Sequence, residues 1–98
     1  MNFTMNKNGN ELTVTIEGRL DTLTAPQLEQ KLDPALADVN KLIFDLTELE
    51  YISSAGLRVL LASRQKMEGK DGMTVKNVND DIMEVFEITG FADILDIE

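Results

Sequence analysis

One short apolar run constrains the fold of this chain more than any other feature: Leu42-Ile43-Phe44-Asp45-Leu46. A continuous run of this kind is typical of a central β-strand that is covered on both faces. Apolar residues at helical spacing flank it in the sequence, namely Ala25, Leu28, Leu32 and Leu36 before it and Leu57, Leu60, Leu61 and Met67 after it. A buried strand between two helices predicts right-handed crossovers and a mostly parallel sheet.

The N-terminal segment predicts a β-hairpin. Its apolar residues alternate with polar ones at a period of two, and they are Phe3, Met5, Leu12, Val14 and Ile16. Asn8-Gly9 stands between the two halves of this pattern, and Asn-Gly is a common pair in tight hairpin turns. The hairpin is therefore expected to bury one face against the rest of the domain.

The helix boundaries are also readable. Thr24 is expected to cap the first helix, with Gln27 as the partner in a capping box and Pro26 in the first turn. Pro34 predicts a kink or an irregular last turn in that helix, because proline lacks the N–H that an inner helical turn needs. Residues 47–56 are interpreted as a connection to the second helix, which Gly69 and Gly72 close.

The C-terminal third predicts one more strand and one more helix. Met73, Val75 and Val78 indicate the strand, and the helix is expected to start at Asp80 or Asp81. Gly90 ends this helix, and the apolar tail that follows is expected to pack back as a strand or short helix. The order ββαβαβα plus a tail predicts one α/β domain over residues 1–98, with a small mixed, mostly parallel β-sheet flanked by helices.

Composition excludes several classes of chemistry. The chain has no cysteine and no histidine, so thiol catalysis, thiolate metal sites and the commonest general base are absent. Eighteen acidic residues outnumber nine basic ones, and a net charge of −9 disfavours nucleic acid and anionic membranes as partners. An acidic surface also keeps a small protein soluble. No run approaches the roughly 20 apolar residues of a membrane span, and no signal peptide is evident, so we expect a cytoplasmic protein.

The sequence carries no recognisable catalytic motif. Phosphate-binding glycine loops and a GxSxG turn are absent, so no enzymatic activity, cofactor or metal is expected. Asp45 ends the predicted central strand, where a phosphate-accepting aspartate of the receiver type would lie. Receivers also need an acidic pair after the first strand and a lysine after a later one, and neither is present here. The other carboxylates, such as Glu48 and Asp80, are interpreted as solvated charge.

Two serines precede the second predicted helix, at Ser53 and Ser54. One of the two hydroxyls can cap the helix by accepting a bond from a backbone N–H. A serine at a helix start can also carry a phosphoryl group, because free N–H groups and the helix dipole tolerate an anion there. The residues alone leave both interpretations open.

Three segments give the chain a family resemblance. The longest, Phe44 to Leu61 with Ser53-Ser54-Ala55-Gly56-Leu57 inside it, resembles the signature of STAS domains, specifically the bacterial anti-sigma factor antagonists. Gly18-Arg19-Leu20-Asp21-Thr22-Leu23-Thr24-Ala25 is similar to the family's loop before its first helix. Thr89-Gly90-Phe91, with the apolar tail, is similar to its C-terminus. The resemblance therefore spans nearly the whole chain and implies a STAS fold.

The resemblance also implies a role in partner switching. Such an antagonist binds an anti-sigma factor serine kinase and so frees the sigma factor, until the kinase phosphorylates a serine at the start of the second helix. A metal-dependent serine phosphatase reverses this. The family's motif places the phosphorylated residue at Ser54, with Ser53 as second choice. The expected partner-binding residues are Asp21, Thr22, Ser53, Ser54, Ala55, Gly56, Leu57 and Arg58.

Two positions depart from the family pattern. Ser53 replaces an acidic residue, and Arg58 replaces a glycine. The resemblance implies a monomer that forms hetero-complexes. It also implies that the chain itself is not an enzyme, since the kinase and the phosphatase supply the chemistry. The alternative is a STAS interaction module in another regulatory complex, with the helix-start serine only structural.

Overall fold

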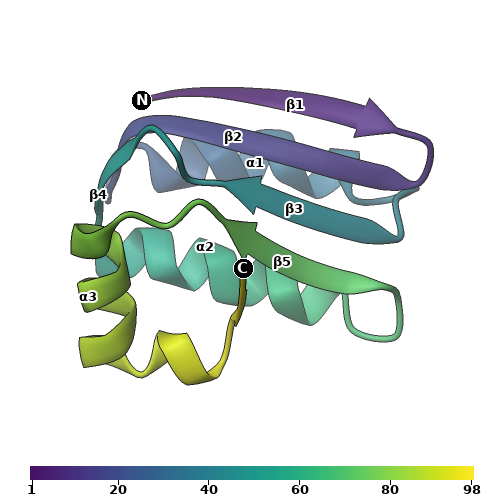
Figure 1. Ribbon diagram of the computed structural model, residues 1–98. Helices are drawn as coiled ribbons and strands as arrows, with labels where there is room; N and C mark the ends of the chain where they lie inside the picture. Colours follow the sequence, from purple (N-terminus) through teal and green to yellow (C-terminus); the bar gives the residue numbers. More distant parts are fainter.

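The N-terminal alternation forms the expected hairpin in the computed structural model, which describes residues 1–98 (Figure 1). Strands β1 (Asn2–Asn8) and β2 (Glu11–Leu20) pair antiparallel, with Asn8 opposite Glu11. The two-residue turn is therefore Gly9-Asn10 rather than Asn8-Gly9. Gly9 adopts a φ of 63°, a left-handed conformation that costs glycine nothing.

The apolar run at the centre of the sequence becomes the middle strand of the sheet. This strand, β3 (Lys41–Asp45), lies between β2 and β5 (Gly72–Lys76), and β6 (Asp96–Ile97) completes the order β1-β2-β3-β5-β6. Every pair after the hairpin is parallel. The prediction of a mixed, mostly parallel sheet is confirmed.

One strand was not expected from the sequence. Within the predicted connection 47–56, β4 (Leu49–Ile52) pairs parallel with the last residues of β2, and the register of this pairing shifts between Gly18 and Arg19. The long strand β2 thus pairs with β3 along its first half and with β4 at its end. Leu49 and Ile52 are buried while the two residues between them are exposed, so this strand lacks the period-two alternation that would reveal it.

Three helices complete the fold. α1 (Ala25–Ala35) and α2 (Ser54–Lys66) lie side by side behind the sheet in Figure 1. α3 (Asp80–Thr89) packs against β4 and ends at Gly90, as expected, and the short 3₁₀ helix η1 (Phe91–Asp93) follows it. None of these helices has the length and apolarity needed to cross a membrane.

The core lies on one face of the sheet only. It is a single cluster of 23 buried residues that includes Leu42 and Phe44 of β3 but not Ile43. Ile43 points to the opposite face, in a row with Thr13 and Thr74, and neighbouring side chains bury it. The prediction that β3 is buried on both faces is confirmed, although α1 and α2 both pack on the core face (Figure 1).

Candidate functional site at the start of α2

The parallel strands bring the starts of the helices to one edge of the sheet. Strands β2, β3 and β5 all run toward this edge, and β4 adds a short strand there (Figure 1). The loop after β2 leads into α1, and β4 leads directly into α2. Two of the predicted segments, the loop at Asp21 and the serines at the start of α2, therefore lie at the same edge, where open α/β sheets place their ligand sites.

Ser53 takes the role of helix cap. Its backbone is extended, with φ −97° and ψ 177°, and its Oγ accepts a hydrogen bond from the backbone N–H of Gly56 at 3.4 Å. Ser54 is the first residue of α2, and its side chain is exposed. Capping therefore uses the Ser53 hydroxyl and leaves the Ser54 hydroxyl without a role in the cap.

Gly56 and Leu57 lie beneath this surface rather than on it. Both residues are buried, and a Cβ atom at Gly56 would lie 2.7 Å from Ile52 Cγ1 and 2.8 Å from the carbonyl oxygen of Leu20. The same Leu20 oxygen accepts a hydrogen bond from the N–H of Ser53 at 2.9 Å. The start of α2 is therefore held tightly against the ends of β2 and β4, and only glycine fits at the contact.

The loop before α1 is organised by Asp21. Its Oδ1 accepts hydrogen bonds from the N–H groups of Leu23, at 3.0 Å, and Thr24, at 3.1 Å. The bond from Thr24 contributes most to lowering the pKa of Asp21 below its usual value, and the bond from Leu23 adds to it. The positive charge of Arg19 lowers this pKa further. Asp21 therefore remains ionised at neutral pH, and Thr22 is exposed beside it.

Thr24 does not form the expected capping box. Its side chain makes no cap hydrogen bond to α1. Instead its Oγ1 donates to the carbonyl oxygen of Arg19 and accepts from the N–H of Asp21, both at 2.8 Å. The prediction was wrong because the hydroxyl closes the preceding loop, and Asp21 supplies the acceptor for the N–H of Thr24.

Leu23 is a surface feature that the sequence analysis did not single out. It is 80% exposed, the highest value among the large apolar residues, and lies between Asp21 and Thr24. Nearby on the same edge, the Arg19 guanidinium carbon lies 4.1 Å from the centre of the Tyr51 ring, across the β2–β4 pair. Leu23 falls outside every apolar stripe, which is the one sequence signal that could have marked it as a surface residue.

A shallow groove between α1 and α2 adjoins Ser54. Its volume is about 330 Å³, and Ala25, Pro26, Glu29, Ala55, Arg58, Val59 and Ala62 line it. Two of the predicted contact residues, Ala55 and Arg58, thus form one wall, while the helix that follows the Asp21 loop forms the other. The groove therefore borders two of the residues that the sequence predicted as partner contacts.

Comparison with known proteins identifies the family. The STAS domain family profile matches residues 2–98. The chain belongs to the STAS domain family. The anti-sigma-B factor antagonist of Bacillus subtilis (strain 168) is 31% identical over 98 residues, which cover 99% of this chain and 90% of the relative.

Solved structures agree with this assignment. The crystal structure of an anti-sigma factor antagonist from Mycobacterium paratuberculosis has a TM-score of 0.88 and 26% identity, and the alignment covers 98% of this chain and 83% of that one. The Bacillus cell fate determinant SpoIIAA in its phosphorylated form has a TM-score of 0.76 at 19% identity, over 99% of this chain and 91% of that one. The second likeness establishes a shared fold.

Asp45 of this STAS domain is engaged in local structure. Its side-chain Oδ1 accepts hydrogen bonds from Thr47 Oγ1 at 2.6 Å, from Thr47 N–H at 3.1 Å and from Asn77 Nδ2 at 3.0 Å. Partial burial raises the pKa of Asp45, but these bonds outweigh burial and hold it below its usual value. No group of three or more potential metal-binding side chains surrounds it. Asp45 ties together the loops after β3 and β5, which gives the receiver interpretation no support.

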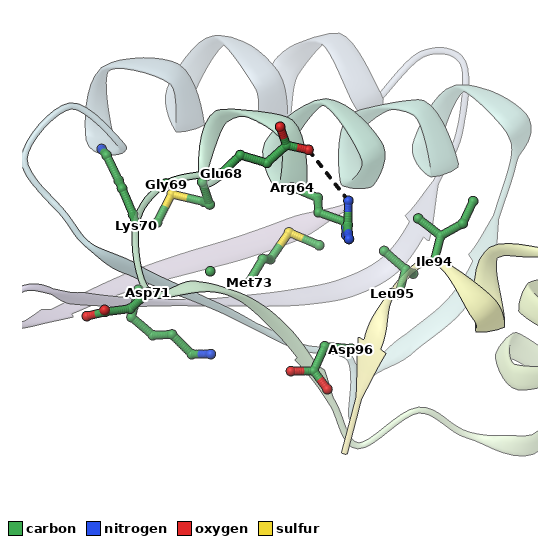
Figure 2. A pocket seen from close by; sticks show the side chains of 12 residues that line it. Arg64, Glu68, Gly69, Lys70, Asp71, Met73, Ile94, Leu95 and Asp96 are labelled. Carbon is green, nitrogen blue, oxygen red and sulfur yellow. Dashed lines mark ion pairs between the residues drawn. The ribbon is translucent and has the colours of Figure 1, made fainter.

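A larger cavity lies at the other end of α2 (Figure 2). It measures about 370 Å³ and is bordered by the last turn of α2, the turn into β5, and the segment around Ile94. Its charged residues balance, with three basic (Lys41, Arg64, Lys70) and three acidic (Glu68, Asp71, Asp96), and Arg64 pairs with Glu68 at 3.7 Å. None of the residues predicted as partner contacts lines this cavity, so the start of α2 remains the candidate site of the STAS domain.

Proposed function

We propose that this protein is an anti-sigma factor antagonist whose binding is controlled by phosphorylation of Ser54. In its unmodified form it binds an anti-sigma factor serine kinase in the cytoplasm and so releases the sigma factor. Phosphorylation of Ser54 by that kinase ends the interaction, and a serine phosphatase restores it. The antagonist role is supported by the relatives from Bacillus subtilis and Mycobacterium paratuberculosis, which are named as antagonists, and a phosphorylated form is known for SpoIIAA.

The observation that carries the proposal is the division of roles between Ser53 and Ser54. Ser53 caps α2 through its hydroxyl, while the Ser54 hydroxyl is exposed at the first helical residue. A kinase can reach Ser54 without breaking the cap. Ser53, the second choice, would have to give up its bond to Gly56 before it could be modified.

A phosphoryl group on Ser54 is compatible with the folded domain and incompatible with docking. It carries about −1.5 to −2 charges, and the free N–H groups at the start of α2 tolerate such an anion. A partner shaped around a neutral hydroxyl would have to desolvate this charge without compensation. That cost of several kcal/mol weakens binding by roughly a thousandfold or more.

We define the docking surface as the exposed and half-buried residues around Ser54: Asp21, Thr22, Leu23, Ser53, Ser54, Ala55 and Arg58. Gly56 and Leu57, which the resemblance also implicates, support it from below because both are buried. Leu23 supplies the apolar anchor that such a surface needs, since a few well-buried side chains carry most of the energy of a protein interface. The chain itself acts as a binding module, and the kinase and the phosphatase perform the chemistry.

The rival interpretation is a STAS interaction module whose serines serve only the helix. The two are separated by intact-mass measurement and peptide mapping of the protein after incubation with the cognate kinase and ATP. We expect one phosphoryl group on Ser54 and none on the Ser54→Ala variant. Protein that stays unmodified, while the kinase phosphorylates another antagonist, would favour the rival.

A further inference from the structure

Arg58 is the basic side chain that follows Ser54 by one helical turn. Residues four apart on an α-helix are neighbours on its surface, with Cβ atoms about 5–6 Å apart. Both residues lie within α2 and are exposed. The long Arg58 side chain can therefore reach a group attached to the Ser54 oxygen without any change in the backbone.

Arg58 is also free to make such a contact. The structure contains four ion pairs, and their basic members are Lys7, Arg19, Arg64 and Lys66. The first turn of α2 contains no acidic residue. Glu29, on α1 across the groove, is the carboxylate that shares the groove with Arg58, and the two are not paired.

We propose that Arg58 is the intramolecular partner of a phosphoryl group on Ser54, held by a charge-assisted ion pair along one face of α2. Guanidinium groups bind phosphate oxygens in a bidentate manner, and a phosphoryl group carries nearly twice the charge of the Glu29 carboxylate. The phosphoryl group on the same helix is therefore the stronger competitor for Arg58.

The pairing adds a second component to the switch. In the unmodified protein Arg58 is a free cation on the docking surface, available to an acidic group of the partner. After phosphorylation the same guanidinium is occupied from within the chain. Modification of Ser54 thus changes the docking surface twice, by adding negative charge and by withdrawing the Arg58 cation. The inference rests on the proposed phosphorylation of Ser54.

The test requires no kinase, because phosphoserine is incorporated at position 54 during protein synthesis. The second pKa of the phosphoryl group, near 6 in an unpaired phosphoserine, is measured by ³¹P NMR in the otherwise unchanged protein and in Arg58→Gln. An exposed ion pair favours the dianion, so we expect the pKa to be higher in Arg58→Gln by roughly 0.3–0.5 of a pH unit. Arg58→Lys should lie between the two.

Arg64→Gln is the matched control, since it removes an exposed arginine from the opposite end of the same helix. It should leave the phosphoryl pKa unchanged, which separates a specific pair from a general effect of net charge. Equal pKa values in the Arg58→Gln and unchanged proteins would overturn the inference. That result would leave the Ser54 switch intact, because the switch is judged by partner binding and by mapping of the phosphate.

Discussion

The hydroxyl oxygen of Ser53 accepts a hydrogen bond from the backbone N–H of Gly56, and this bond caps α2 without Ser54. The two adjacent serines therefore differ in what they contribute. Ser53 stabilises the start of the helix, whereas the Ser54 hydroxyl is exposed on the surface.

The difference predicts unequal effects of the two alanine substitutions on stability. Ser53→Ala removes the cap and should lower the free energy of unfolding by about 1 kcal/mol. Ser54→Ala should change it by less than about 0.5 kcal/mol, because Ser54 is exposed and does not cap the helix. Urea unfolding followed by circular dichroism measures both. A larger loss for Ser54→Ala than for Ser53→Ala would show that the cap has been assigned to the wrong serine.

Gly56→Ala should destabilise the domain. Alanine in a helix is normally more favourable than glycine by up to about 1 kcal/mol. Here the added Cβ would meet Ile52 Cγ1 at 2.7 Å and Leu20 Cγ at 2.9 Å, so we expect a net loss of about 1–3 kcal/mol. Urea unfolding measures whether the free energy of unfolding falls or rises in Gly56→Ala. A stabilised variant would mean that the start of α2 can move away from β2.

The depressed pKa of Asp21 predicts a particular pH dependence. A carboxyl group whose pKa is lower in the folded state adds stability above its unfolded pKa of about 3.9, and this contribution is lost as the pH falls toward the folded value. Asp21→Asn keeps an oxygen acceptor for the N–H groups of Leu23 and Thr24 but removes the charge. The stability advantage of the unchanged protein should be constant above about pH 5 and shrink below about pH 4. Unfolding curves in which the advantage grows with acidity would contradict the assignment.

Leu23 should matter for binding and not for folding. Leu23→Ser is expected to weaken the complex with the anti-sigma factor about tenfold or more, since truncation of an apolar anchor costs more than 1 kcal/mol. Ile88→Ser is the matched control, because Ile88 is 77% exposed and lies in the last turn of α3, outside the docking surface. Both variants should unfold like the unchanged protein. Equal affinity of the two serine variants would remove Leu23 from the proposed surface.

Much of the fold could be predicted because its strongest signals are local. The hairpin alternation, the apolar run of β3 and the glycine at the end of α3 each act through neighbouring residues, and each is confirmed. The strand β4 could not be found in this way. It exists because β3 pairs with β2 only as far as Thr15 and leaves the end of β2 with a free edge, which is a property of the assembled sheet.

The candidate site was predicted less completely than the fold. The motif indicated two serines at the start of a helix, but the choice between them depends on the backbone angles of Ser53 and the position of the Gly56 N–H. The sequence likewise indicated Thr24 as a cap, whereas contacts with Arg19 and Asp21 direct its hydroxyl into the loop. Leu23 was missed because exposure follows from the loop conformation that Asp21 imposes.

The central claim is that the docking surface accepts a neutral Ser54 and rejects a charged one. Isothermal titration calorimetry of the cognate anti-sigma factor kinase with Ser54→Ala and Ser54→Asp tests it most directly. Gln65→Asp, which places the same charge at an exposed position near the other end of α2, serves as the control. We predict that Ser54→Ala and Gln65→Asp bind like the unchanged protein while Ser54→Asp shows no measurable binding. Tight binding of Ser54→Asp by the kinase would contradict the account.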